Sequence, residues 1–249
     1  MSAAAHRAYF RFYAELNDHL RAADQFNLLE KRFHVPGAVM DMIESFGVPH
    51  TEVELILANG RSVGFGYLVQ DGDRISVYPM FEALDITPEL RVRKEPLRNP
   101  KFVLDVHLGK LAAYLRMLGF DTLYRSCFTD PELARISREQ HRILLTRDRG
   151  LLKHSSVTHG YWLRNTDSRQ QTAEIVNRFD LGGFIRPFTR CMACNGSLRE
   201  APKQEILGLV PARIAELHDI FRRCVECRRV YWQGSHHESM LRFVRRLVA

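Results

Sequence analysis

The chain has 249 residues, 45% of them apolar and 26% charged, which is enough to bury one large hydrophobic core or two to three small ones. No apolar run reaches the roughly 18 residues that a membrane-spanning helix needs, so no membrane span is expected. The first residues contain no apolar stretch of the kind found in signal peptides, so we expect a soluble, cytoplasmic protein.

The net charge of +7 is unevenly distributed. Residues 1–100 contain 11 Lys/Arg and 14 Asp/Glu, residues 101–182 contain 13 and 9, and residues 183–249 contain 12 and 6. All of the excess positive charge therefore follows residue 100. Clustered Lys and Arg bind polyanions by displacing phosphate counterions, so nucleic acid is the expected partner of this half. A basic but otherwise unspecialised soluble surface explains the charge equally well.

Residues 7–82 predict a small α+β domain. Apolar residues alternate with polar ones from Phe10 to Leu16, as in a half-buried strand, and a helix is expected from Val39 to Phe46. Asn59-Gly60 predicts a hairpin, and a last strand is expected at 74–78. This stretch resembles the β-grasp ubiquitin-like fold, particularly its sulfur-carrier branch, most clearly in the segment LVQDGDRISVYP. Because no diglycine ends the domain, a role in docking a partner protein or presenting a substrate is expected in place of sulfur transfer.

Residues 83–100 contain several prolines and many charged side chains and are expected to form a linker. Apolar runs then alternate with amphipathic stretches up to residue 182. Strands are expected at 102–104, 122–124, 142–146 and 161–163, and helices at 108–118, 131–140 and 168–179. Such repeated strand–helix units predict a parallel sheet with helices on both faces, which binds ligands beyond the carboxyl ends of its strands.

Four aspartates follow these strands and are candidates for a ligand site. Asp105 and Asp148 come after the first and third strands, and Asp130 and Asp167 after the second and fourth. Grouped carboxylates bind hard cations such as Mg²⁺ or Mn²⁺, which orient a phosphate and activate a water. Asp130 and Asp167 are also explained as helix N-caps, with Pro131 at the first helical position in the case of Asp130.

Four of the five cysteines form two C-x₂-C pairs, Cys191 with Cys194 and Cys224 with Cys227. Two such pairs supply the four thiolates of a tetrahedral structural Zn²⁺ site. The 29 residues between the pairs exceed the usual spacing and imply an insertion, and Asn195-Gly196 suits a tight turn. Metal-free buried cysteines or a redox pair are the alternatives. The fifth cysteine, Cys127, is expected to be a small buried hydrophobic residue.

The runs KFVLDVHLGKLAAYLRMLGFDTLYRS and TDPELARISREQHRILLTRDRGLL closely resemble the Mut-seven C-terminal RNase family. The segment CRRVYWQGSHHESM resembles the C-terminal end of the same family, so the resemblance covers about residues 101–240. It implies a PIN-like nuclease that hydrolyses RNA with a divalent metal, in which Asp105, Asp130 and Asp148 are catalytic and bind Mg²⁺ or Mn²⁺. PIN proteins often have a further acidic residue between the first and middle ones, and only Asp121 lies there.

Basic residues near these aspartates and basic and aromatic residues around the second cysteine pair are candidates for RNA binding. They are Lys110, Arg147, Arg149, Arg222, Arg223, Arg228, Arg229, Tyr231 and Trp232. Basic residues interleaved with aromatic ones suit single-stranded RNA, through phosphate contacts and base stacking. Core packing of the aromatic residues and a solvated face of arginines is the alternative.

The sequence therefore predicts a β-grasp domain at 7–82, a PIN-like three-layer α/β/α domain with a parallel sheet at 101–182, and a zinc ribbon with a C-terminal helix at 183–249. The favoured function is hydrolysis of RNA phosphodiester bonds at a Mg²⁺ or Mn²⁺ centre, with a structural Zn²⁺. One alternative is a non-catalytic RNA-binding protein with a degenerate nuclease centre. Another is an adaptor whose β-grasp domain recruits a protein partner.

Overall fold

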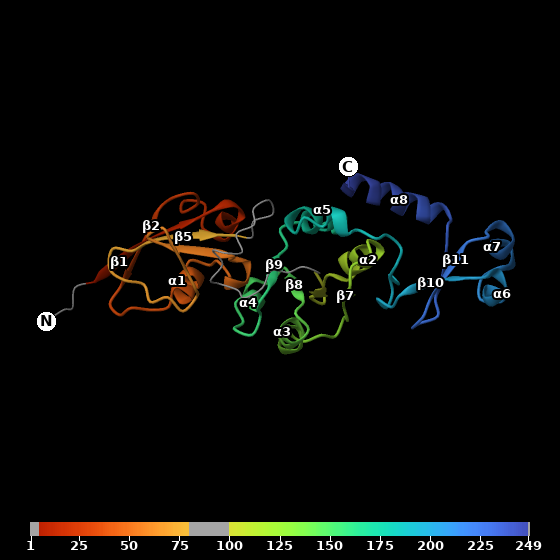
Figure 1. The fold of residues 1–249 in the computed structure, drawn as a ribbon, viewed down its shortest axis with the longest axis horizontal. Coiled ribbons are helices and arrows are strands. Elements are labelled where there is room, and N and C mark those ends of the chain that lie inside the picture. The colour runs from red at the N-terminus through yellow and green to blue at the C-terminus, as the bar shows by residue number, and fades with distance from the viewer. Residues whose placement is uncertain (1–4, 80–99, 249) are drawn as a thin grey trace. The chain divides into compact units, whose positions relative to one another are not determined.

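The computed structural model describes residues 5–79 and 100–248 (Figure 1). The predicted linker lies outside the described residues except for Pro100. The chain divides into two compact units. The N-terminal unit contains residues 1–99 together with residues 148–162, and the C-terminal unit contains residues 100–147 and 163–249.

A five-stranded mixed sheet forms most of the N-terminal unit. Its strand order is β2-β1-β5-β3-β4, in which β1 and β5 are parallel and the other pairs are antiparallel. The strands are β1 (His6–Phe12), β2 (Leu29–Phe33), β3 (Leu55–Ala58), β4 (Arg61–Val63) and β5 (Arg74–Tyr78). Helix α1 (Val39–Ser45) contributes Val39 and Ile43 to the core, where they join Phe10, Ile56 and Ile75. The predicted helix, hairpin and last strand are confirmed, and Gly47 ends the helix with a positive φ of 104°.

The first strand differs from the sequence prediction. It ends at Phe12, and a 3₁₀ helix, η1 (Ala14–His19), follows where the strand was expected to continue. The Asn17 side chain donates to the carbonyls of Phe12 and Ala14, so it stabilises a turn that alternation alone cannot reveal. Leu16 is buried as expected, but it reaches the core from this turn.

A parallel sheet is the centre of the C-terminal unit. Strand β6 (Phe102–Leu104) lies between β7 (Thr122–Leu123) and β8 (Ile143–Thr146) and is parallel to both. Helices α2 (Gly109–Met117) and α5 (Ser168–Arg178) cover one face, and α3 (Asp130–Glu139) covers the other (Figure 1). The predicted parallel sheet with helices on both faces is therefore confirmed.

Two further short elements of this region belong to the N-terminal unit. They are α4 (Arg149–Leu152), which the sequence analysis did not anticipate, and β9 (Gly160–Trp162), which was predicted as the fourth strand. The N-terminal unit also contains η2 (His50–Glu52).

The cysteine pairs lie in a small antiparallel sheet of the C-terminal unit. Its strands are β10 (Leu198–Ala201), β11 (Phe221–Cys224) and β12 (Val230–Trp232). The predicted insertion is present between β10 and β11, as α6 (Lys203–Ile206) and α7 (Ala212–Leu217). It has its own small core, in which Ile206 and Ala215 pack with Ala201 and Phe221. The short η4 (Gly182–Phe184) precedes this region and the terminal helix α8 (Ser235–Val248) follows it.

Of the helices in residues 5–79 and 100–248, none is both long enough and apolar enough to cross a bilayer.

Candidate metal centre and nucleic-acid interface

Each cysteine pair lies on a tight turn of the same construction. In the first turn the backbone N–H of Cys191 donates to Gly196 O (2.7 Å), and in the second the N–H of Cys224 donates to Arg229 O (2.9 Å). The residue after each second cysteine has a positive φ, 72° at Asn195 and 65° at Arg228. A Cβ atom on Gly196 would meet the Glu226 side chain and Cys224 Sγ, so only glycine fits there.

The two turns bring the four sulfur atoms together. All four Sγ atoms lie within 4.8 Å of one another, with Cys191 and Cys227 3.6 Å apart and Cys194 and Cys224 3.4 Å apart. Tetrahedral coordination with metal–sulfur bonds of about 2.3 Å requires sulfur–sulfur distances of about 3.8 Å. The cluster therefore fits one tetrahedral, thiophilic ion such as Zn²⁺ at the sequence-predicted ligands.

Ionisation of these thiols is coupled. Burial opposes it at Cys191, but the Tyr231 hydroxyl and the backbone N–H groups of Ala193 and Cys194 stabilise the thiolate and lower its pKa to about 7. Burial raises the pKa of Cys227 to about 12, with the neighbouring thiols acting in the same direction. Four crowded thiolates repel one another unless a cation joins them, so this geometry calls for a metal ion.

The first cysteine turn packs on the α/β domain through buried polar contacts. Arg116 of α2 is buried and donates to the carbonyls of Thr122, Met192 and Ala193. Asn195 accepts from Thr122 N (3.0 Å) and donates to Asp121 Oδ1 (2.8 Å). These hydrogen bonds therefore join the first cysteine turn of the ribbon to the segment that runs from α2 to β7.

Asp121, the acidic residue between Asp105 and Asp130, takes part in these contacts. Its carboxylate accepts from Arg142 Nη1 (2.8 Å) and Asn195 Nδ2, and Arg190 lies 3.7 Å away. Burial raises its pKa, but these hydrogen bonds and positive charges outweigh burial and hold the pKa below its ordinary value. Asp121 thus has a structural role. Its position just before a strand does not reveal that role in the sequence.

Asp105 follows β6 at the carboxyl edge of the parallel sheet. Its carboxylate is half-buried and accepts a hydrogen bond from Thr146 Oγ1 at the end of the neighbouring β8 (2.7 Å). Its backbone N–H donates to Leu145 O (3.1 Å). A half-buried carboxylate with a defined orientation therefore lies where parallel sheets bind their ligands.

Asp148 lies two residues after the end of β8, the strand that ends with Thr146. It is exposed and is the N-cap of α4, where Oδ1 accepts from Gly150 N (2.7 Å). The next residue, Arg149, places its guanidinium 3.9 Å from the ring centroid of Trp162, a cation–π contact. Asp148 therefore has a capping role, which its position after a strand did not predict.

Asp130 and Asp167 were both predicted to be possible N-caps, and only Asp167 is one. Asp167 accepts from Arg169 N and Gln170 N at the start of α5. Thr129, which forms a capping box with Glu132, is the N-cap of α3, so Asp130 is the first helical residue and Pro131 the second. Thr129 lies one position before Asp130, and from there its hydroxyl reaches the backbone N–H of the N3 residue, Glu132. The exposed Asp130 carboxylate is therefore not needed for capping.

Among the residues that the structure describes, the cysteine cluster is the one group of three or more His, Cys, Asp or Glu side chains close enough to share an ion. Asp105, Asp130 and Asp148 do not form such a group. Their assignment as one metal site stays a prediction.

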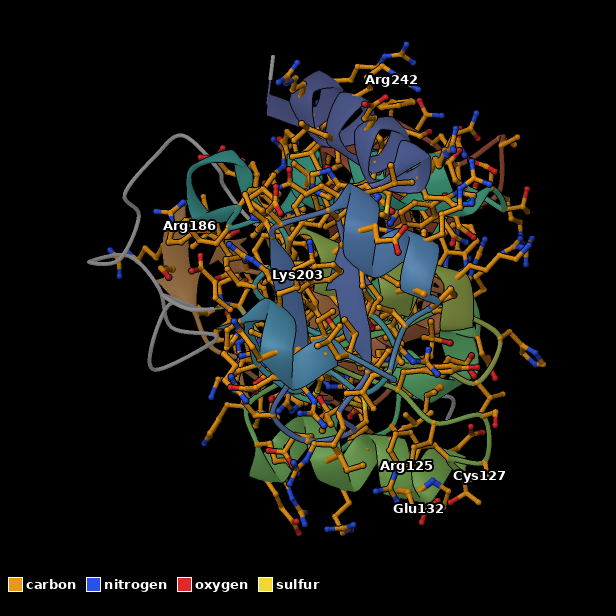
Figure 2. All side chains as sticks on the ribbon, turned by 90° about the vertical axis from the view of Figure 1, so that its right-hand side faces the viewer. Arg125, Cys127, Glu132, Arg186, Lys203 and Arg242 are labelled. Carbon is orange, nitrogen blue, oxygen red and sulfur yellow. The ribbon has the colours of Figure 1, made fainter. Side chains whose placement is uncertain are left out.

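The basic and aromatic candidates have different environments. Lys110, Arg147, Arg228 and Arg229 are exposed, whereas Arg222, Arg223 and Tyr231 are half-buried. Arg222 donates to Phe188 O (2.6 Å), Arg223 donates to Arg228 O (3.4 Å), and Tyr231 places its hydroxyl 3.0 Å from Cys191 Sγ. Trp232 is 37% exposed. Arg186, Lys203 and Arg242 add positive charge to the side of this unit that Figure 2 shows.

Cys127 contradicts its sequence interpretation. It is exposed, close to the start of α3, where Figure 2 shows it together with Arg125 and Glu132. The expectation of a small buried residue was wrong because Cys127 lies in the loop after β7, outside the apolar faces of the sheet and of α3.

The segment that begins with Asp148 packs against the ubiquitin-like domain within the N-terminal unit. Glu52 is fully buried: Oε2 pairs with His19 Nε2 (2.9 Å) and Oε1 accepts from Trp162 N (2.6 Å). His50 Nε2 donates to Val157 O (2.9 Å), and Lys153 Nζ donates to Glu44 O (2.9 Å). The contacts of Trp162, Val157 and Lys153 join residues more than 100 positions apart, so no local pattern in the sequence signals them.

These features define a mixed α/β protein with an N-terminal ubiquitin-like domain, a parallel-sheet domain and a four-cysteine cluster that fits a zinc ribbon. Residues 100–244 match the family model of the Mut7-C RNAse domain, and residues 5–85 match that of the Mut7-C ubiquitin domain. The first match spans more than half of the chain, so the chain belongs to the Mut7-C RNAse domain family, and a nuclease-type function follows at the family level. Neither the curated proteins nor the solved structures contain a match.

Proposed function

We propose that this protein is a metal-dependent ribonuclease that hydrolyses RNA phosphodiester bonds, with Asp105, Asp130 and Asp148 as ligands of Mg²⁺ or Mn²⁺. The observation that carries the proposal is the half-buried Asp105 carboxylate at the carboxyl edge of the sheet, oriented by Thr146 (2.7 Å). The family match over residues 100–244 supports the same chemistry.

The proposed catalytic ion is held in part by the substrate. Mg²⁺ and Mn²⁺ bind through a few carboxylates and complete their coordination with water and phosphate oxygens. When bound, such an ion stabilises the charge that develops on the phosphate and activates a water. Of the residues proposed here, the aspartates hold the ion, and Lys110, Arg147 and Arg149 bind phosphate oxygens of the RNA.

The cysteine cluster completes the proposal as a structural Zn²⁺ site. A closed set of four thiolates leaves no open position for a water or substrate, so the ion stabilises the ribbon and takes no part in hydrolysis. The ribbon then contributes Arg222, Arg223, Arg228, Arg229, Tyr231 and Trp232 to RNA binding. The domain limits 7–82, 101–182 and 183–249, a protein partner of the first domain and a cytoplasmic location belong to the same proposal.

The test compares Asp105→Asn and Asp148→Asn with Asp167→Asn. Asparagine is as good an N-cap as aspartate, so Asp148→Asn removes the charge and keeps the α4 cap. We expect the first two variants to lose Mn²⁺-dependent cleavage of single-stranded RNA by on the order of 100-fold or more, with RNA affinity little changed. Asp167→Asn is the matched control, because it changes an exposed capping aspartate in the same way, and it should keep full activity.

Thermal denaturation of the same variants separates a catalytic role from a structural one. Folded Asp105→Asn and Asp148→Asn proteins that still cleave RNA at the parent rate would overturn the catalytic assignment. RNA binding by a parent protein that does not cleave with Mg²⁺ or Mn²⁺ would instead establish a non-catalytic RNA-binding protein.

A further inference from the structure

A pocket lies between the ribbon and the start of α8, outside the proposed catalytic residues. It measures about 530 Å³ when the open solvent inside it is included. Its walls come from the loop before the first cysteine turn, from the ribbon strands and from α8. Its lining residues include Phe188, Met192, Arg222, Tyr231, Trp232 and His237.

Ring systems make up much of this wall. The Phe188 and His237 rings are 4.4 Å apart between centroids, with an interplanar angle of 38°. Trp232 is 37% exposed although it is one of the largest apolar side chains of the ribbon. Planar π-faces that line a hollow and remain partly exposed suit a planar, aromatic ligand, because stacking excludes water from both surfaces.

The charges around the pocket favour an anionic ligand. Arg222 is held at the wall by its hydrogen bond to Phe188 O (2.6 Å), and none of the described residues that line the pocket is acidic. Arg190 also lines it, but its guanidinium is used by Gly119 O, Asn195 O and Asp121. Burial and the positive charge of Arg222 lower the pKa of His237, so its ring is neutral near pH 7 and can both stack and form hydrogen bonds.

The metal site and the pocket share a wall. The Tyr231 hydroxyl lies 3.0 Å from Cys191 Sγ, a distance at which it donates to a metal-bound thiolate, and Tyr231 also lines the pocket. Met192, which also lines the pocket, lies between the two cysteines of the first turn. An ion held by the four cysteines would therefore also order one side of the pocket.

We propose that this pocket binds one unpaired base of single-stranded RNA, with the phosphate next to that base held by Arg222. This inference rests on the proposed function, because it assumes that RNA is the ligand of the ribbon. A base needs flat apolar surfaces, hydrogen-bonding edges such as those of Gln233 and His237, and a nearby cation for its phosphate, and the pocket offers all three. A base inside a duplex is covered on both faces and cannot enter.

The experiment uses Trp232 as a reporter. The chain contains two tryptophans, so Trp162→Phe leaves Trp232 as the single one. Its fluorescence is followed during titration, without added Mg²⁺ or Mn²⁺ and with zinc retained, with an unstructured RNA of about ten nucleotides, with a blunt duplex, and with an abasic strand of equal length. We expect quenching by the unstructured RNA only. Equal quenching and affinity with the abasic strand would overturn the proposal, because that strand has phosphates but no bases.

Two variants measured by anisotropy of labelled RNA keep the proposal falsifiable if Trp162→Phe fails to fold. His237→Ala and Arg222→Ala should each weaken binding of the unstructured RNA about tenfold, and His237→Ala should leave binding of the abasic strand unchanged. Arg213→Ala is the control for charge, since it removes one exposed arginine outside the pocket, and it should change affinity by no more than about twofold. Unaltered zinc content and melting temperature show that the variants are folded.

Binding and cleavage failures are distinguishable in this design. A protein that discriminates against the abasic strand but never cleaves RNA keeps the pocket assignment and loses the nuclease proposal. A folded His237→Ala protein that binds the unstructured RNA as tightly as the parent overturns the pocket assignment, whether or not the protein cleaves.

Discussion

The four cysteines and the three proposed catalytic aspartates are held in different ways. The cysteine sulfur atoms lie within 4.8 Å of one another, although 29 residues separate the two pairs. Each aspartate has its own environment: Asp105 accepts from Thr146, Asp148 caps α4, and Asp130 is exposed at the start of α3. The cysteine sulfur atoms are therefore spaced like the ligands of one ion, whereas each aspartate is held by contacts of its own.

The difference follows from what each ion has to do. A structural ion takes all of its ligands from the protein, so the chain must bring them together, and metal binding then contributes directly to folding. A catalytic Mg²⁺ or Mn²⁺ keeps positions for water and phosphate, so closely grouped carboxylates would repel one another for as long as substrate is absent. Removing a cysteine should therefore lower the stability of the fold, whereas removing one of the carboxylates should not.

The largest effect is expected at the cysteine cluster. Cys224→Ser should lower the zinc content of purified protein from about one ion per chain to near zero and unfold the ribbon, because the folding free energy of such sites comes largely from the metal. Elemental analysis and thermal denaturation measure both effects. Cys127→Ser is the matched control, since Cys127 is exposed and outside the cluster. Full zinc occupancy in Cys224→Ser would contradict the structural role.

The second-largest effect is expected at Glu52, which holds the segment that begins with Asp148 by accepting from Trp162 N. Glu52→Gln should destabilise the N-terminal unit by about 3–5 kcal/mol, because it removes one charge of a fully buried pair with His19 and weakens the acceptor of Trp162 N. Urea denaturation measures it. Glu30→Gln is the control on the same domain: Glu30 pairs with the exposed Arg32, where solvent screens the charges, so a much smaller loss of stability is expected. Equal losses in the two variants would show that the buried contacts are not what holds this segment.

A smaller effect is expected at the junction of the ribbon and the α/β domain. Asp121→Asn should cost about 2 kcal/mol at pH 7, because Asp121 accepts charge-assisted hydrogen bonds from Arg142. The pKa of Asp121 is lower in the folded state, so its contribution is present above the unfolded value and is lost as pH falls through the folded value. The stability difference between variant and parent should therefore shrink below about pH 4. A difference that grows on acidification would have the wrong sign for this carboxylate.

The smallest effect concerns the orientation of Asp105. Thr146→Val removes the hydroxyl that donates to Asp105 and should cost about 1 kcal/mol of stability, with a larger proportional loss of Mn²⁺-dependent cleavage than of RNA affinity. Thr146→Ser keeps the hydroxyl and should retain most of the activity. Identical cleavage by the valine and serine variants would show that this hydrogen bond does not position Asp105.

Much of the candidate site could be predicted because its signals are local. A C-x₂-C pair followed by a residue that tolerates positive φ specifies its own turn, as Asn195 shows. Strand β6 is visible as a short apolar run that ends at Asp105, and the helix after it as apolar residues at helical spacing. The break after Phe12 could not be predicted, because it depends on the Asn17 side chain bonding to two carbonyls and on Ala14 adopting a φ of 47°.

The sequence by itself determined most of the strands and helices, the parallel sheet, the order of the ubiquitin-like and RNase domains and the four clustered cysteines, since periodicity, turns and short spacings are local properties. Only the tertiary structure decided the partners of charged residues. Asp121 binds Arg142 and Asn195, Arg116 binds the first cysteine turn, and Glu52 binds the backbone of Trp162. A buried charge requires a partner, but the partner is chosen by how distant segments pack, and the sequence encodes that packing in no local pattern.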